Sequence, residues 1–132
     1  MKKLGLILLV VASSATAQQS PPWETYQPTG EYLQPAVIPE AFQAEWVEDL
    51  EFCGTGLSDT RLLITDNTLS FYESDGEVVS VLRHNSRAIT VTASYAGEGQ
   101  VWDSLDRLVL SRSQDQLTIT SGDHSFTRQR CK

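Results

Sequence analysis

Hydrophobic and polar side chains alternate with a period of two through much of the chain after residue 60. Successive side chains of a β-strand point to opposite faces, whereas the apolar face of a helix repeats every 3.6 residues. Leu117 and Ile119 follow the two-residue period, as do Leu108 and Leu110. The longest such run consists of Ile89, Val91, Ala93 and Tyr95. The pattern therefore predicts half-buried β-strands rather than helices.

Turn-forming residues punctuate these segments, mostly at spacings of about 8 to 12 residues, as in the hairpins of sandwiches and barrels. They are Asp66-Asn67, Asp75-Gly76, Asn85-Ser86, Gly97-Glu98-Gly99, Ser113-Gln114-Asp115 and Ser121-Gly122-Asp123. The predicted strands lie near residues 60–65, 68–74, 77–84, 87–95, 100–111, 116–121 and 124–130. Residues 42–48 predict a further strand, although Pro39 to Phe42 could instead open a short helix. The expected fold is all-β, an antiparallel meander of seven or eight strands, and closing it into a barrel removes the exposed edges.

The first 17 residues have the features of a signal peptide. Lys2 and Lys3 provide the positive start, and an apolar run of nine residues follows. Ala15-Thr16-Ala17 supplies the small-residue pattern after which signal peptidase cuts. A membrane span needs about 20 helical residues, so this run is too short to be one. We expect cleavage after Ala17 and a protein that works in a bacterial periplasm or outside the cell.

The chain divides into three expected parts: the signal peptide (1–17), a proline-rich arm or linker (18–40) and one β-barrel domain (41–132). The 115 residues left after cleavage suffice for one domain with a modest core. All five prolines fall in the arm, together with Trp23, Tyr26 and Tyr32. The arm is either a disordered leader or an extended segment whose aromatic residues dock on the domain or on a partner.

The mature chain is acidic, with eight basic and seventeen acidic residues once Lys2 and Lys3 are removed. The imbalance lies in residues 18–60, here called the acidic front, which contain no lysine or arginine. Its carboxylates are Glu24, Glu31, Glu40, Glu45, Glu48, Asp49, Glu51 and Asp59. Nucleic acid is an unfavourable partner, because phosphate binding needs clustered basic side chains. The front, with Glu45, Glu48 and Glu51 as candidate binding residues, either recognises a basic surface or only keeps the protein soluble.

The two cysteines predict one disulfide, Cys53–Cys131, since small exported domains commonly carry such bonds. On the chain-entropy account, closing a loop of this length contributes about 4 to 5 kcal/mol. His84 and His124 do not complete the close paired spacing of a zinc site, so we expect no metal. We also expect no cofactor, no membrane span and a monomer.

Phe42, Ala44 and Trp46 resemble the Gly-x-Trp signature on the first strand of calycins, with Ala44 in place of the glycine. Calycins are small β-barrels that include lipocalins and avidin-like proteins. In them a basic residue of the last strand packs over this tryptophan, and Arg128 and Arg130 are the candidates here. The resemblance covers residues 41–131 and implies a structural closure of the barrel by Trp46 and one of these arginines. It leaves function open, because calycins include transporters, binding proteins and inhibitors.

The expected layout conflicts at one point with the disulfide. In an eight-stranded up-and-down barrel the ends of the first and last strands lie at opposite rims, yet Cys53 and Cys131 follow those two ends. A disulfide needs Cα atoms within about 7 Å of each other. Either residues 49–59 fold back along the barrel, or the strand count is wrong by one.

Catalytic and phosphate-binding motifs are missing from the sequence, which predicts no catalytic residue. Glu73 and Asp75 form a carboxylate pair, but their position before Gly76 favours a solvated hairpin tip. Glu98 lies between two glycines and close to Trp102, a pattern typical of a plain turn. The same arrangement could present a carboxylate beside an aromatic ring to a sugar or a cation, so Glu98 and Trp102 are possible binding residues.

The leading hypothesis is an exported, non-enzymatic binding protein of the cell envelope that takes a small apolar ligand or a protein partner. A completely filled barrel interior would remove its small-ligand version. The alternative is an inhibitor of an exported hydrolase such as a lysozyme or a protease, toward which the acidic front would steer a basic enzyme. A third hypothesis, an enzyme that uses Glu98 or Asp103 as general acid or base, has the least support.

Overall fold

A computed structural model describes residues 29–132, together with Gly5, Val10 and Val11. Nearly all of the predicted signal peptide, its cleavage site and residues 18–28 of the arm, with Trp23 and Tyr26, lie outside the described residues. None of the helical turns in the described part of the chain has the length and apolar character that a membrane crossing requires.

The described residues form nine strands and two 3₁₀ turns. The strands are β1 (Glu31–Tyr32), β2 (Ala44–Val47), β3 (Leu62–Ile64), β4 (Thr68–Phe71), β5 (Ser74–Asn85), β6 (Ala88–Gly97), β7 (Gln100–Leu110), β8 (Gln116–Ser121) and β9 (His124–Arg130). The 3₁₀ turns are η1 (Glu40–Phe42) and η2 (Leu50–Phe52).

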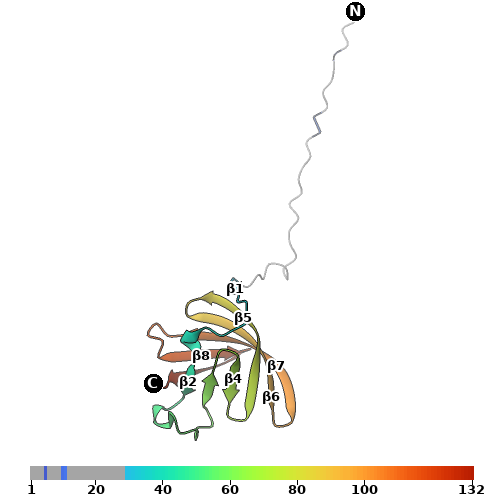
Figure 1. The fold of residues 1–132 in the computed structure, drawn as a ribbon. Helices are drawn as coiled ribbons and strands as arrows, with labels where there is room; N and C mark the ends of the chain where they lie inside the picture. Colours follow the sequence, from blue (N-terminus) through green and yellow to red (C-terminus); the bar gives the residue numbers. More distant parts are fainter. Residues whose placement is uncertain (1–4, 6–9, 12–28) are drawn as a thin grey trace, which may run out of the picture.

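Each strand from β2 to β9 pairs antiparallel with the next, and β9 returns to pair with β2. The sheet therefore closes into an eight-stranded barrel (Figure 1). β1 is an additional short strand that pairs with the second half of β5, where Tyr32 lies opposite Leu82. The predicted all-β antiparallel barrel is confirmed, with eight strands in the barrel wall.

One predicted turn is wrong. Asp75 and Gly76 lie inside β5, and the chain reverses three residues earlier, at Tyr72 and Glu73. Gly76 serves packing instead of turning: a β-carbon there would lie 2.5 Å from Cε1 of Tyr95, on the neighbouring strand β6. The glycine thus makes room for an inward-facing aromatic ring, which is one of the uses of glycine within strands.

The segment before the barrel contains both alternatives that the sequence left open, a 3₁₀ turn at Glu40–Phe42 and then strand β2. The described part of the arm, residues 29–40, lies against the barrel. Leu33 donates its amide hydrogen to Val81 O, and Ile38 does so to Asp66 O, at 2.9 and 2.7 Å. Ile38 is 1% exposed and belongs to the core, so part of the predicted arm, before residue 41, packs as part of the barrel core.

The end of the barrel near η1, here called the closed end, is filled and hydrogen-bonded. Trp46 is fully buried, and its indole N–H donates to Phe42 O at 2.9 Å. The Arg130 guanidinium lies 4.4 Å from the ring centroid of Trp46, in cation–π contact. Arg130 also donates to the backbone oxygens of Gln114 and Ala41. One arginine thereby joins the last strand, the tryptophan and the 3₁₀ turn that caps the barrel.

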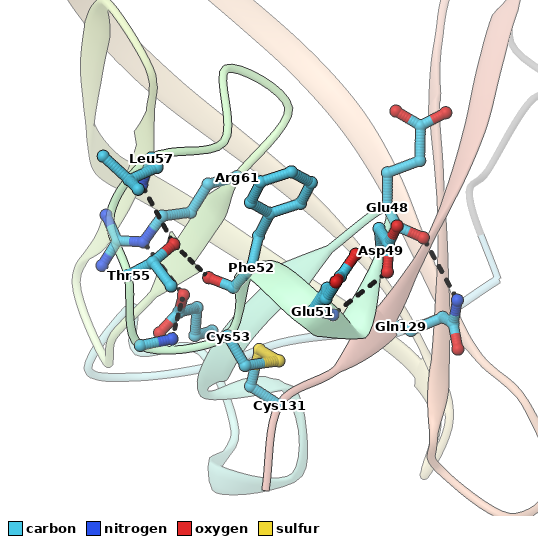
Figure 2. Close-up of a disulfide and its surroundings, with 12 residues drawn as sticks. Glu48, Asp49, Glu51, Phe52, Cys53, Thr55, Leu57, Arg61, Gln129 and Cys131 are labelled. Atoms are coloured by element: carbon cyan, nitrogen blue, oxygen red, sulfur yellow. Dashed lines mark hydrogen bonds and ion pairs between the residues drawn. A yellow bond between two sulfur atoms is a disulfide. The ribbon is translucent and has the colours of Figure 1, made fainter.

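Residues 48–61 form a loop, here called the stapled loop, that folds back to the end of β9 (Figure 2). Cys53 and Cys131 are disulfide-bonded with a Cα–Cα distance of 5.6 Å. The Gly54 amide donates to Glu45 Oε1 of β2 at 3.2 Å, which brings the loop beside the first barrel strand. The predicted disulfide is present, and the fold-back of residues 49–59 resolves its conflict with an eight-stranded barrel.

Candidate functional site

The end of the barrel opposite the closed end, here called the mouth, carries three tight turns. These two-residue turns join β4 to β5 at residues 72–73, β6 to β7 at 98–99, and β8 to β9 at 122–123. Glu98 and Gly99 both have positive φ, of 50° and 75°, as a hairpin turn with the twist of its strands requires. The mouth is where inward-facing side chains meet solvent.

A cavity of about 160 Å³, here called the cup, lies just inside the mouth. Its walls come from every barrel strand between β4 and β9. The lining residues are Phe71, Ser74, Tyr95, Trp102, Ser104, Asp106, Ile119, Ser121 and Phe126. Below it, the barrel interior is occupied by a cluster of buried side chains that includes Leu69, Val91 and Leu108. The site is therefore a shallow cup and not a deep ligand cavity.

Aromatic rings form much of the cup wall. Tyr95 and Trp102 are register partners on β6 and β7, and their rings stack with centroids 5.7 Å apart and an interplanar angle of 9°. Phe71 lies 6.0 Å from Tyr95 and 6.5 Å from Phe126, between centroids. Trp102 remains 40% exposed, so it forms the boundary between the cup and solvent. Such a wall offers both apolar area and ring faces to a ligand.

Asp106 places a carboxylate in this aromatic surrounding. Asp106 is 6% exposed, and its carboxylate accepts a hydrogen bond from the Ser104 hydroxyl at 2.7 Å. The Ser104 oxygen also lies 3.4 Å from the hydroxyl of Ser121 on β8. The described residues contain two ion pairs, Arg61–Glu45 and Arg83–Glu31, and neither involves Asp106. The carboxylate is thus buried without a cationic partner in the described chain.

The Tyr95 hydroxyl is the second buried polar group of the cup. Tyr95 is 3% exposed, and among the described residues its hydroxyl has no hydrogen-bond partner. Burial raises the pKa of Tyr95, and the nearby charge of Asp106 raises this pKa further. The hydroxyl therefore keeps its proton at neutral pH. The Asp106 carboxylate is near enough to raise this pKa but does not meet the geometry of a hydrogen bond with the hydroxyl. Buried polar groups are normally paired, so an unpaired one lining a cavity points to a missing partner.

Two rim carboxylates stand next to each other at the mouth. Glu73, Glu98 and Trp102 line a second hollow of about 150 Å³, which shares Ser74 and Trp102 with the cup. The turn of Glu73 can approach that of Glu98 because Gly97 has no side chain: a β-carbon there would clash with Glu73 O. A hydrogen bond to Glu98 and repulsion between the two charges raise the pKa of Glu73.

The sequence-predicted binding residues fall in two separate places. Glu98 and Trp102 lie together at the mouth. Glu45 is instead a structural residue, since Oε1 lies 3.3 Å from Arg61 Nε and also accepts the Gly54 amide. Glu48 and Glu51 lie in the stapled loop (Figure 2). The cup therefore includes none of these three glutamates.

The acidic front is less uniform than its sequence implies. Glu45 is paired with Arg61, and Glu31 with Arg83 at 3.0 Å, so two of its carboxylates have basic neighbours from later in the chain. Its remaining charge is concentrated in the stapled loop, where a hollow of about 430 Å³ opens to solvent. This hollow is lined by Glu48, Asp49, Phe52, Ser58, Asp59 and Thr60.

The two arginines proposed for the barrel closure have different positions. Arg130 lies over Trp46 at the closed end, whereas Arg128 lies over Phe126, with 4.6 Å between its guanidinium carbon and the ring centroid. Arg128 also donates to Thr60 O at 3.0 Å and so ties β9 to the stapled loop.

Asp103, the other carboxylate near Trp102, is exposed on the outer side of β7.

Sequence reasoning missed Tyr95 and Asp106 as site residues. The signal was present in the alternation of β7. Leu108 and Leu110 mark its inward phase, and the same phase two and four residues earlier falls on Asp106 and Ser104. Polar residues at inward positions of a strand are unexpected for packing alone. They mark the place where the barrel interior changes from core to site.

Comparison of this chain with known protein families, with curated proteins and with solved structures finds no match.

Proposed function

We propose that this chain is an exported, non-enzymatic binding protein that takes a small ligand in the cup at the barrel mouth. The observation that carries the proposal is the Tyr95 hydroxyl, buried and unpartnered among the described residues beside the Asp106 carboxylate. A ligand with a polar end would supply the missing hydrogen bonds, and its apolar part would lie against the aromatic rings. A few convergent polar groups in an apolar cavity are typical of ligand sites.

Size limits what this cup can hold. Cavities that enclose a drug-sized ligand measure roughly 300 to 1,000 Å³. The cup measures about 160 Å³, about half of the lower limit of that range. The ligand, or the part of it that enters, is therefore a small group, and a long apolar molecule extending through the barrel does not fit.

Two features support a binding role over catalysis. The residues lining the cup include no histidine, lysine or cysteine, and Asp106, which accepts the Ser104 hydroxyl hydrogen, is their single carboxylate, so the cup has neither a histidine–carboxylate nor a paired-carboxylate arrangement. Glu98 and Asp103, the residues of the enzyme hypothesis, lie in a turn and on the outer wall. Both carboxylates are therefore placed outside the cup.

Export and a calycin-like barrel fold belong to the same proposal. Export is supported by the signal-peptide features of residues 1–17 and by the disulfide, which forms and persists in oxidising compartments. The calycin-like assignment is supported by the buried Trp46, the arginine over its ring and the 3₁₀ turn that accepts hydrogen bonds from both.

The experiment is a fragment screen by NMR on the isotopically labelled protein purified after export. Fragments of up to about six non-hydrogen atoms should shift resonances of cup residues such as Tyr95, Trp102 and Ile119. The variant Tyr95→Phe removes only the unpartnered hydroxyl and should weaken binding, whereas the matched control Tyr32→Phe changes an exposed tyrosine and should not. Shifts confined to the outer wall, or none at all, would contradict the proposal.

The stapled loop favours a second candidate, an inhibitor of an exported hydrolase. Apolar side chains are exposed on it among carboxylates, with Leu50, Phe52 and Leu57 at 52%, 38% and 78% exposure. The disulfide, the Asp49 cap on Glu51 N and the Thr55–Phe52 hydrogen bond hold its shape (Figure 2). A preorganised exposed loop loses little entropy on binding.

Rates of a purified lysozyme and of exported proteases, measured with excess protein at low and moderate salt, test this candidate. Inhibition that Leu57→Ser abolishes and Val101→Ser preserves would support it. Val101 is the matched control, because it is equally exposed, at 78%, on the outer side of β7. Unchanged hydrolase rates at both salt concentrations would remove the candidate.

A further inference from the structure

The cup contains a buried carboxylate, as cation-binding sites commonly do, and no lysine or arginine is among its lining residues. Asp106 is buried, accepts one hydrogen bond from Ser104, and forms no ion pair within residues 29–132. A carboxylate has about four lone-pair positions, so it can accept further hydrogen bonds. A buried charge that lacks a partner is strongly unfavourable, which favours a ligand that carries the opposite charge.

The rim of the mouth adds to this negative potential. Each of its three tight turns carries one carboxylate, from Glu73, Glu98 and Asp123, and none carries a lysine or arginine. At the opposite end of the barrel the connections between strands carry both signs of charge, with Arg87 and Arg112 balanced by Asp66 and Asp115. The raised pKa of Glu73 is a second sign that negative charge is crowded at the mouth. Such a field attracts small cations and repels anions.

The walls of the cup also suit a cation. The faces of Tyr95 and Trp102 carry the negative part of the ring quadrupole, which attracts ammonium groups. Arg128 already lies on Phe126 and donates to Thr60 O, so one positive charge of the chain is engaged at that side of the cup. The cup offers acceptors on β6, β7 and β8. Within the described residues the Tyr95 hydroxyl has no partner, whereas the Asp106 carboxylate and the Ser121 hydroxyl each contact Ser104 and keep further lone pairs.

We propose, on the basis of the binding function argued above, that the cup ligand is a small primary alkylammonium compound. Its three N–H groups match the three acceptors, Asp106, Tyr95 and Ser121. Its alkyl chain, of about four or five carbons given the cup volume, packs against Phe71 and Trp102. The rim carboxylates contribute to attraction of the ligand and do not contact its ammonium group.

The test compares three probes of equal length at constant ionic strength and pH 7: n-pentylammonium, 1-pentanol and pentanoate. Each is titrated into the isotopically labelled protein purified after export, and dissociation constants are taken from shifts of cup resonances. We expect n-pentylammonium to bind at least tenfold more tightly than 1-pentanol, and pentanoate to bind least. Equal binding of the amine and the alcohol would overturn the ammonium assignment while leaving the binding function in place. If none of the probes or fragments shifts the cup, the proposed function itself fails.

Two variants locate the effect at Asp106. Asp106→Asn keeps the shape of the side chain and removes its charge, so the preference for the amine should fall to about twofold or less while 1-pentanol binding is retained. Asp103→Asn removes an exposed carboxylate three residues earlier on the same strand and should keep the preference. An unchanged preference in Asp106→Asn would overturn the proposal. If Asp106→Asn does not fold, Tyr95→Phe replaces it, and binding of the amine should weaken at least threefold and by more than that of the alcohol. An equal loss for both probes would overturn the ammonium assignment.

Discussion

Each end of the barrel brings a large aromatic side chain close to a charged group, but the two ends differ in whether the polar groups find partners within the described chain. At the closed end, Trp46 is buried, its indole N–H is hydrogen-bonded, and Arg130 covers its ring while donating to backbone oxygens. At the mouth, Trp102 is 40% exposed, the Tyr95 hydroxyl is unpartnered in the described chain, and Asp106 lacks a counter-ion there. One end completes its own interactions, and the other leaves them open.

This difference separates stability from binding. Interactions that are complete within the chain lower the free energy of the folded state, whereas buried groups without partners raise it. Proteins commonly hold such unfavourable arrangements where a ligand completes them. Substitutions at the closed end should therefore cost stability, and substitutions in the cup should cost little or even stabilise the fold.

The largest expected effect is loss of the disulfide that fastens the stapled loop to the end of β9. Cys53 and Cys131 are 78 residues apart in sequence, so replacing both with alanine should lower the free energy of unfolding by about 4 to 5 kcal/mol. Chemical denaturation of the variant and of the parent protein measures the difference. A loss below about 1 kcal/mol would show that the barrel does not depend on this bond.

Trp46→Ala is the direct test of the closed end. It removes a fully buried ring and its contact with Arg130, so we expect a loss of about 3 to 5 kcal/mol. The matched substitution at the mouth, Trp102→Ala, should cost only about 1 to 2 kcal/mol because that ring is partly exposed and stacked on one neighbour. Equal losses at the two tryptophans, measured by denaturant titration, would break the contrast between the ends.

Tyr95→Phe is expected to move stability in the opposite direction. The substitution keeps the ring and removes a buried hydroxyl that has no partner in the described residues, so the free energy of unfolding should rise by about 1 kcal/mol. Tyr32→Phe, at an exposed position, should leave it unchanged. A marked loss of stability in Tyr95→Phe would mean that its hydroxyl is bonded in the folded protein.

The smallest effect concerns the rim. Because Glu98 raises the pKa of Glu73 in the folded state, the charged form of Glu73 is disfavoured on folding, and this penalty is present above the raised pKa. It disappears below the unfolded-state pKa, where the carboxyl is protonated in both states. Glu73→Gln should therefore raise Tm slightly at pH 7 and leave it unchanged near pH 3. Asp75→Asn serves as the control at a neighbouring exposed carboxylate.

Local pattern predicted most of the wall and little of the site. The alternation of Ile89, Val91 and Ala93 placed β6 correctly, since its inward and outward faces differ in polarity. The Asp75-Gly76 pair misled the prediction, because glycine serves a turn and a close ring contact equally well, and only the position of Tyr95 on the next strand distinguishes them. Strand β1 was also missed, as two residues carry no periodicity.

The cup could not be predicted because it depends on register. Tyr95, Asp106 and Phe126 belong to three strands, and they meet only because β6, β7, β8 and β9 pair with particular offsets. Sequence pattern assigns a residue to a face but not to a height along the barrel. Glu98 and Trp102 were found because they are close in sequence, whereas Glu45, Glu48 and Glu51 were grouped by proximity along the chain and line neither the cup nor the hollow at its rim.

The seam between β2 and β9 has a further consequence for motion. It contains two residue pairs, Trp46–Arg130 and Val47–Gln129, whereas β6 and β7 share ten. β3 and β4 also share only two pairs, but a short turn joins them directly and limits their separation. A sheet that opens by thermal fluctuation should part where the fewest backbone hydrogen bonds hold it, so amide exchange in β2 should precede exchange in β6. The bond between Cys53 and Cys131 crosses this seam and keeps its two sides tethered after they part. Because the disulfide keeps the two strands at a high effective concentration, they pair again quickly, and brief openings between β2 and β9 do not separate the remaining strands.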